Sequence, residues 1–486
     1  YSDPAAVGLA AQVAQHYERG GQPLIALEWV MRGVEESQRR YQIEEGLQLV
    51  EQGMRLVQRV VGRLRERERA EKEFSLLVSK LDLQWKGGQI QEAWETVARL
   101  GSLAESLDIS KKIEARQWQT QWYIRAAQYS QALDCAQEAY ALSPGDSILR
   151  GVILDQIGLI HFCTGEYQAA LRYYQEALKI FQGRDPVKEA YVRNSCANAL
   201  VKLGDLKGAL EHYAVALELY REDQQKASGI LNNMGAALRY LGEYSQALLY
   251  LERACSIDRA IGNRLGLGFS LCNLAQVYRL LGAFAHAIDL SQQAHQIFTS
   301  LGDRFGQSMM ERWLGSTYRD LAQYERSAQY LRRALEGARA IGARAEEGEA
   351  LVELGATLLD SGHLDEAFSC LHQALALSQQ HQWLRARVYT VFAEAYLAQK
   401  EAEKALEATQ RALELIGQGG WKGVPLICAH YVKYRALKTL DRPEALEALR
   451  AAQQELLRTA DQITDPSLRT SFLEIPLHRE ILAESS

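Results

Sequence analysis

The chain has 486 residues, 47% of them hydrophobic, and one compact core rarely grows this long, so we expect several domains or an extended repeat. The 55 Lys and Arg residues against 61 Asp and Glu residues give a net charge of -6, which argues against a protein that coats nucleic acid. The seven cysteines are scattered without a CxxC pair, and no apolar run approaches the roughly 20 residues of a membrane helix. We therefore expect a cytoplasmic protein that contacts neither membrane nor nucleic acid directly.

Residues 1–61 are predicted to form helices with weak repeat character. Apolar residues recur at helical spacing in "HYERGGQPLIALEWVMRGVEESQRRYQIEEGLQLVEQGMRLV", which begins at His16. The chain starts with Tyr1 rather than Met, from which we expect a piece of a longer polypeptide.

A charged stretch follows this first segment. Arg55, Arg59 and Arg63 lie four residues apart beside the run at 62–74, and such a cluster can touch nucleic acid. The run carries both signs of charge at helical spacing, however, which favours a solvated helix with internal ion pairs.

A regular array is predicted over residues 62–416, built on a phrase such as "LRYLGEYSQALLYLERA", which begins at Leu238. Each repeat carries two apolar stripes of helical period, so each forms a hairpin of two helices, A and B, and hairpins at a fixed period stack into a solenoid. Small residues in helix A, such as Gly235 and Gly315, should let two helix backbones approach closely. The turn within each hairpin recurs every 38 to 40 residues, at Gly165, Gly204, Gly242, Gly282, Ala322, Gly362 and Lys400.

This pattern resembles the tetratricopeptide repeat. The family signatures of Trp/Leu-Gly-Tyr in helix A and Ala-Phe-Ala in helix B are met by Leu314, Gly315, Tyr318, Tyr324, Leu331 and Ala334. The resemblance implies an all-α fold, a right-handed superhelical solenoid of antiparallel helix hairpins. No proline occurs between Pro186 and Pro425, which is consistent with long uninterrupted helices.

The segment "GQGGWKGVP", residues 417–425, is rich in glycine and is predicted to be a joint where the array bends most readily. Residues 426–486 then provide a last helical pair and a tail that caps the array. These boundaries complete a division of the chain into four segments.

Both ends of the chain resemble signal-transduction ATPases with numerous domains (STAND), a group of large bacterial regulators. The segment from His16 is similar to the one that follows the ATPase and winged-helix domains of that family. The segment "ITDPSLRTSFLEIPLHREIL", Ile463 to Leu482, is similar to their closing segment, although it is one residue shorter between Glu474 and Pro476. The resemblance implies a sensor arm that receives a protein or small-molecule inducer and acts on an upstream ATPase domain.

The sequence carries no catalytic or cofactor motif that we recognise. It lacks GxxxxGK[ST], HExxH and GxSxG, and the "GLG" at residues 266–268 has no strand before it. We therefore expect no enzyme activity, no cofactor and no metal site.

Candidate binding residues follow from their positions in the repeat. In the tetratricopeptide family helix A lines the concave surface, and Arg239, Arg279 and Arg319 repeat there every 40 residues. Such a ladder, spaced by about 10 Å, suits a carboxylate, a phosphate or a peptide backbone. Neighbouring acids such as Asp320 would pair with it if its role is structural. The polar residues at these helix A positions are Asn194, Asn198, Asn232, Asn233, Arg239, Asn273, Gln276, Arg279, Arg312 and Arg319.

The carboxylate clamp of chaperone-adaptor repeats is only half present. Asn198 and Asn232 match its two asparagines, but Asn194, Phe269 and Asn273 stand where that clamp has basic side chains. An anion would therefore have to be held by the arginines.

From these features we expect a non-enzymatic sensor and protein-interaction module that binds an inducer or peptide in its concave groove, as the arm of a STAND-type ATPase. The alternative is a stand-alone scaffold, similar to the Leu-Gly-Asn repeat scaffolds, that binds extended peptides of partner proteins in the same groove. A phosphate-binding loop upstream in the same reading frame would favour the sensor.

Overall fold

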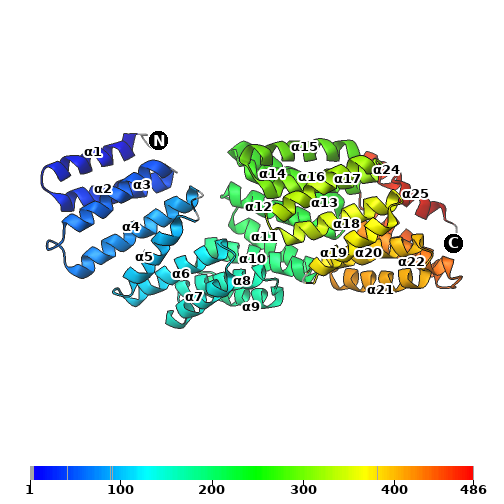
Figure 1. Ribbon diagram of the computed structural model, residues 1–486, viewed down its shortest axis with the longest axis horizontal. Coiled ribbons are helices and arrows are strands. Elements are labelled where there is room, and N and C mark those ends of the chain that lie inside the picture. Colours follow the sequence, from blue (N-terminus) through cyan, green and yellow to red (C-terminus); the bar gives the residue numbers. More distant parts are fainter. Residues whose placement is uncertain (1–4, 41, 88, 90, 380, 485–486) are drawn as a thin grey trace. The chain divides into compact units, whose positions relative to one another are not determined.

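The computed structural model describes residues 5–40, 42–87, 89, 91–379 and 381–484. This part of the chain forms 25 helices and no β-strand, so the predicted all-α class of stacked helix hairpins is confirmed. No helix in the described residues is both long enough and apolar enough to cross a membrane. The chain divides into two compact units, residues 1–184 and 185–486 (Figure 1), while the predicted boundaries at 61, 416 and 425 stay predictions.

The first unit is a succession of helices in which each packs against the next. Phe74, Leu81 and Val97 are fully buried between neighbouring helices of this unit. The helices are α1 (Ala5–Arg19), α2 (Pro23–Arg40), α3 (Ile43–Arg59), α4 (Glu66–Lys86), α5 (Ala93–Ala104), α6 (Ile109–Arg125), α7 (Tyr129–Leu142), α8 (Ile148–Cys163) and α9 (Tyr167–Phe181).

The second unit contains seven successive hairpins and two short closing helices. In each hairpin the even-numbered helix is helix A and the odd-numbered one is helix B. The helices are α10 (Pro186–Leu203), α11 (Leu206–Leu219), α12 (Gln224–Tyr240), α13 (Tyr244–Ile261), α14 (Arg264–Leu280), α15 (Phe284–Leu301), α16 (Arg304–Asp320), α17 (Tyr324–Ala340), α18 (Arg344–Asp360), α19 (Leu364–Leu377), α20 (Gln382–Ala398), α21 (Ala402–Gln418), α22 (Val424–Thr439), α23 (Ala445–Asp461), α24 (Pro466–Leu473) and α25 (Pro476–Ala483).

The turns inside the hairpins lie where the repeat spacing placed them. All seven predicted turn residues have a positive φ, including Ala322 at 56° and Lys400 at 64°. This backbone region is open to glycine but costs a residue with a side chain about 1–2 kcal/mol. The other five turns use glycine and avoid that cost.

Within a hairpin, a helix A glycine faces a fully buried helix B leucine. A Cβ on Gly235 would lie 2.5 Å from Cγ of Leu251, and a Cβ on Gly315 would lie 2.6 Å from Cγ of Leu331. There is no space for a methyl group at either position, because the leucine side chain already fills it. The close helix approach predicted from these glycines is confirmed.

Capped helix starts mark the junctions between hairpins. The side chains of Asp223, Asn263 and Asp303 each accept a hydrogen bond from the backbone N–H three residues on, at 3.1, 3.2 and 3.1 Å. Gly262 and Gly302, which precede two of these caps, have positive φ and end the previous helix.

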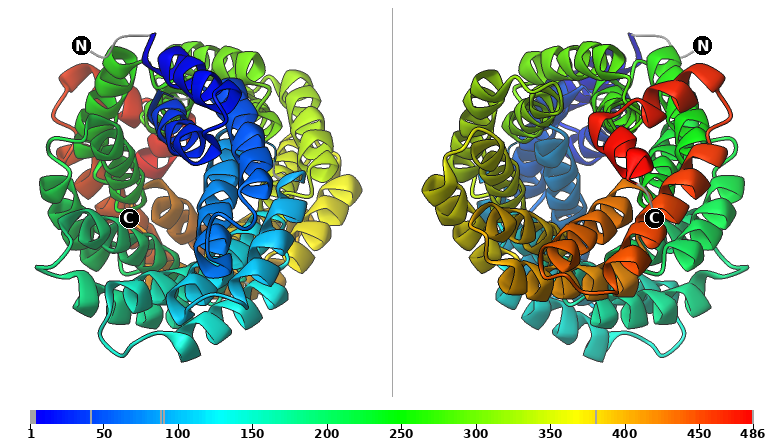
Figure 2. Two further views of the ribbon diagram at one scale, coloured as in Figure 1. Left: turned by 90° about the vertical axis from the view of Figure 1, so that its left-hand side faces the viewer. Right: turned by 90° about the vertical axis from the view of Figure 1, so that its right-hand side faces the viewer.

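The last helices of the second unit return to its early hairpins. The hydroxyl oxygen of Tyr244 accepts a hydrogen bond from the backbone N–H of Val424 at 3.2 Å, and the amide of Gln462 donates to Glu243 at 2.9 Å. These partners are 180 and 219 residues apart in the chain. Figure 2 shows the closing helices, in red, beside the green early hairpins. The array of the second unit therefore closes on itself.

Two turn glycines leave room for this closure. A Cβ on Gly204 would lie 2.6 Å from the carbonyl oxygen of Gln418, and a Cβ on Gly282 would lie 2.5 Å from that of Ser471. The glycine-rich segment 417–425 is thus packed tightly against an earlier hairpin turn.

Candidate functional site

The helix A faces of the second unit surround a cavity of about 690 Å³. Its wall comes mainly from α12, α14, α16, α18, α20 and α22. The closing segment, residues 466–483 with α24 and α25, completes the wall with Ile475, Pro476, Leu477 and His478. Ligand sites commonly have volumes of about 300–1,000 Å³, so the cavity is large enough for a small ligand.

Half of the predicted binding residues line this cavity. They come from three consecutive helices A and are the four arginines and the glutamine, Arg239, Gln276, Arg279, Arg312 and Arg319. The five predicted asparagines are not among the lining residues.

The five predicted asparagines are already hydrogen-bonded to other side chains. Asn233 donates to Asn194 at 3.1 Å, and Asn273 donates to Asn232 at 2.8 Å, in both cases across neighbouring repeats. The fifth, Asn198, accepts a hydrogen bond from a tyrosine hydroxyl of its own hairpin at 2.6 Å. Four of the amides thus link neighbouring repeats, and the fifth joins the two helices of one hairpin.

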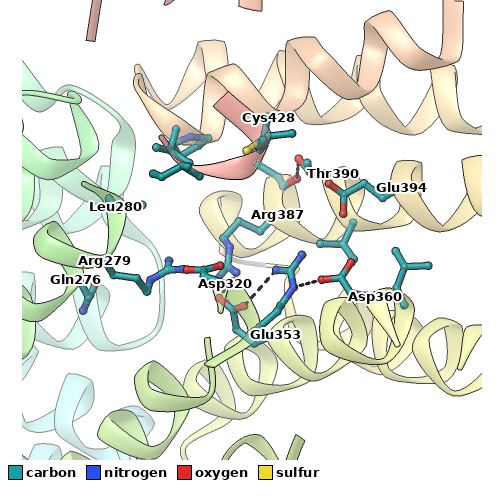
Figure 3. A pocket seen from close by; sticks show the side chains of 18 of the residues that line it. Gln276, Arg279, Leu280, Asp320, Glu353, Asp360, Arg387, Thr390, Glu394 and Cys428 are labelled. Carbon is teal, nitrogen blue, oxygen red and sulfur yellow. Dashed lines mark hydrogen bonds and ion pairs between the residues drawn. The ribbon is translucent and has the colours of Figure 1, made fainter. Parts of the chain in front are cut away.

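Carboxylates of the following repeat pair with the arginine ladder. Nη1 of Arg279 donates to Asp320 at 2.6 Å (Figure 3). Nε of Arg319 donates to Asp360 at 2.7 Å. In both pairs the acid follows the arginine by 41 residues, so the repeat spacing also places the partner. The pairing with Asp320 that we considered from the sequence is present.

Glu353, which the sequence analysis missed, is the centre of the charge network. It is 2% exposed and accepts a hydrogen bond from Arg387 at 2.5 Å, while Nη1 of Arg319 lies 3.8 Å from its other oxygen. Burial alone would raise the pKa of Glu353, but Arg387, Arg279, Arg319 and Arg312 together lower it to about 2. Glu353 therefore remains ionised inside the protein.

The residues predicted from the sequence were amides and arginines at helix A positions of the middle repeats. Acidic residues, and all residues of the later repeats, were not included. Glu349, Arg387 and Glu394 occupy helix A of the two following repeats and line the same cavity. Listing every charged residue at these positions in all repeats would have found them.

One side of the cavity carries hydrogen-bond donors that have no partner. Four buried groups donate no hydrogen bond to any atom of the described residues: Nε of Arg239, Nε of Arg279, Nη1 of Arg312 and Nε1 of Trp313. Arg239 also forms no ion pair there, and its guanidinium carbon lies 4.3 Å from the ring centre of Tyr240. Buried donors without acceptors are costly, which makes this side of the wall receptive to a polar or anionic ligand.

His478 lies in the part of the cavity wall that the closing segment contributes. The residue is 1% exposed, and its Nδ1 donates to the carbonyl oxygen of Phe472 at 2.7 Å. Burial lowers the pKa of His478 to about 4, because the charged imidazolium cannot be solvated there. The imidazole is neutral when the segment is packed.

We expect His478 to make the second unit less stable as the pH falls from about 6.5 to 4. The unfolded chain takes up the proton at the ordinary histidine pKa of about 6.5, before the folded chain does, so about 3 kcal/mol of stability is lost across this window. Urea unfolding between pH 7 and pH 4 should show that His478→Gln lacks this component, whereas a change at the exposed His286 keeps it. An unchanged pH dependence in His478→Gln would contradict the assignment.

Comparison with known proteins agrees with this architecture. The sequence matches the tetratricopeptide repeat family over residues 149–222, 226–300 and 313–339. These stretches run from α8 to α17, so the chain contains tetratricopeptide repeats.

The similarity to individual proteins is partial. The chain is 35% identical over 89 residues to the photosystem I assembly protein Ycf3 of Synechococcus elongatus, which is 18% of this chain and 48% of that protein. It is 34% identical over 67 residues to G-protein-signaling modulator 1 of Mus musculus, 14% of this chain and 10% of that protein. Among solved structures, the apo form of the quorum sensor NprR from B. thuringiensis has a TM-score of 0.55 and 13% identity, covering 72% of this chain and 98% of that one. The chain thus spans at most about half of these curated relatives, and the structural likeness is one of fold.

Proposed function

We propose that this chain is a non-enzymatic sensor and protein-interaction module whose ligand is held in the cavity of the second unit. The observation that carries the proposal is the group of buried donors without partners, led by Arg239, on the wall of the cavity. Guanidinium groups in a partly dehydrated site gain more from an anionic or polar ligand than they would at an exposed surface.

The closure of the array supplies a route from binding to response. Arg239 of an early hairpin and Leu477 of the closing segment line the same cavity, so one ligand can contact both. A ligand that prefers this arrangement stabilises the closed form over an open one by the difference in its contacts. Repeat arrays transmit such a bias because each repeat touches chiefly its neighbours.

The module acts as the arm of a STAND-type regulator, with an upstream ATPase domain as its partner. The two terminal segments, from His16 and from Ile463, support this assignment by their similarity to that family. Sequencing the complete reading frame tests it: an upstream phosphate-binding loop supports the arm, and a frame without one contradicts it.

A second candidate is a stand-alone scaffold that binds an extended peptide. The match to G-protein-signaling modulator 1 over 67 residues favours it. Such a peptide would run along the helix A faces and would require the closing segment to move away. Hydrogen exchange distinguishes the two, because a scaffold ligand should increase exchange in α24 and α25, while a sensor ligand within the cavity should decrease it.

A ligand screen tests the sensor assignment. A library of metabolites and short peptides is added to the wild-type chain, and compounds that raise its melting temperature are retested on Arg239→Gln. This change removes a cation that forms no ion pair with a described residue, so the fold should survive. The exposed Arg253 of the same hairpin provides the matched control, Arg253→Gln. We expect hits that lose about tenfold in affinity with Arg239→Gln only; if every hit binds both variants equally, or no compound binds, the cavity is not the sensor site.

A further inference from the structure

The cavity wall has two chemically different sides. Figure 3 shows Gln276 and Arg279 on one side and Asp360 and Glu394 on the other. The first side belongs to α12, α14 and α16, and the second belongs to α18 and α20. Arginines predominate on the first side, which also holds Asp320 and the unpaired Oε1 of Gln276, and carboxylates predominate on the second side, which also holds Arg387.

On the first side, several donors converge on one place. Arg312 is 5% exposed, and its Nη1 has no partner although its Nε and Nη2 donate to Glu346 at 2.5 and 3.1 Å. Gln276 is also 5% exposed, and its Nε2 lies 3.6 Å from Sγ of Cys272. The guanidinium carbon of Arg312 lies 4.1 Å from the ring centre of Trp313, and that of Arg279 lies 5.7 Å from the same ring centre, so these donors are neighbours.

On the second side, Glu394 is a carboxylate without a cationic partner. The neighbouring Asp360 is engaged by Arg319 at 2.7 Å, whereas Glu394 forms no ion pair with any described residue. Burial raises the pKa of Glu394, and the charge of Asp360 adds to the rise, while Arg319 and Arg435 act in the opposite direction. Glu394 is therefore available to a cationic group in the cavity.

The charges that line the cavity nearly balance. A ligand of high net charge would leave an uncompensated excess in a partly dehydrated space, which disfavours a phosphate dianion as well as a polycation. One anionic and one cationic group on the same ligand preserve the balance. The lining groups are six arginines, Arg239, Arg279, Arg312, Arg319, Arg387 and Arg435, against five carboxylates, Asp320, Glu349, Glu353, Asp360 and Glu394.

We infer that the ligand is a small zwitterion whose carboxylate lies against Arg239, Arg312 and Trp313 and whose ammonium group lies against Glu394. A volume of about 690 Å³ suits a free amino acid derivative or a peptide of a few residues better than a long extended peptide. This inference rests on the proposed sensor function and names the class of its ligand.

Synthetic peptides with and without terminal charges test the inference. Four pools of tripeptides with neutral side chains are used, with both termini free, with an acetylated N-terminus, with an amidated C-terminus, and with both ends blocked. Retention by the full chain is measured by equilibrium dialysis and mass spectrometry, and the affinity of the best-retained peptide by calorimetry. We expect the free form to bind at least tenfold more tightly than either singly blocked form.

Two variants assign each end of the ligand. Arg239→Gln should bind the free and amidated peptides alike, because the carboxylate has lost its partner. Glu394→Gln should bind the free and acetylated peptides alike, because the ammonium group has lost its partner. Arg253→Gln should retain the preferences of the wild-type chain, and circular dichroism melts verify that each variant is folded.

Equal binding of the free and blocked forms by the wild-type chain would overturn the zwitterion assignment, as would unchanged preferences in both cavity variants. Retention of no pool would overturn it as well. The sensor function itself would still stand in these cases if the broader screen yields a ligand that is sensitive to Arg239→Gln.

Discussion

Replacing Glu353 by glutamine will lower the free energy of unfolding of the second unit by about 3 kcal/mol. The carboxylate is 2% exposed and lies among four arginines that hold its pKa near 2, so the neutral amide leaves Arg319 and Arg387 without their shared buried anion. Urea denaturation gives the overall change, and hydrogen exchange of peptides from α16 to α20 locates it.

The matched control is Asp360→Asn. Asp360 also accepts a hydrogen bond from Arg319, at 2.7 Å, but its side chain is 32% exposed, so water can replace the lost carboxylate. We expect a cost below about 1 kcal/mol for this change. If both variants lose the same stability, the buried network around Glu353 is not the reason for the loss.

Gly282→Ala should destabilise the second unit by about 3–4 kcal/mol through two separate effects. The backbone at Gly282 has a φ of 77°, and a Cβ there would lie 2.5 Å from the carbonyl oxygen of Ser471 in α24. The alanine variant must both adopt a strained backbone and push the closing segment away. Unfolding experiments should show the loss, and amides of α24 and α25 should exchange faster.

Gly362→Ala separates the two effects. Gly362 occupies the same turn position with a φ of 84°, but no atom lies within 4 Å of the place its Cβ would take. We expect only the cost of backbone strain, about 1–2 kcal/mol, and unchanged exchange in the closing segment. Faster exchange of α24 in this variant would contradict the role of the Gly282 contact.

The features of the fold that recur in every repeat, namely the turns and the close packing of helix A against helix B, could be predicted from the sequence. The turn residues Ala322 and Lys400 were located by spacing alone, because a period near 40 residues brings the same local geometry back in each hairpin. The helix A glycines were found for the same reason, since Gly315 and its partner Leu331 belong to one local signature.

The closure could not be predicted in this way. Tyr244 and Val424 meet once, 180 residues apart, and a single long-range contact leaves no periodic pattern in the sequence. The glycines at 417–425 predict a flexible joint when only the local sequence is considered. In the structure, Gly419 instead lies against Gly204, and the absence of side chains lets the two backbones come into contact.

The candidate site was predicted in part. Spacing correctly brought Arg239, Arg279 and Arg319 to one wall, because helix A positions stack from repeat to repeat. Spacing alone could not separate them from the asparagines, such as Asn233, which face their neighbours instead of the cavity. Which side chains remain without a partner depends on packing in three dimensions.

Contact between the early hairpins and the last helices of the second unit also limits how many hairpins the unit can gain or lose. An open solenoid gains or loses a repeat at modest cost, since each hairpin contacts only its neighbours. Here Gly204, Gly242 and Gly282 must meet the backbone near Gly419, Gly423 and Ser471 in that order. Duplication or deletion of one hairpin between α14 and α22 would move all three contacts out of register at the same time, and the array could no longer close. We therefore expect the number of hairpins in this unit to be fixed, whereas the number of repeats in an open array can vary.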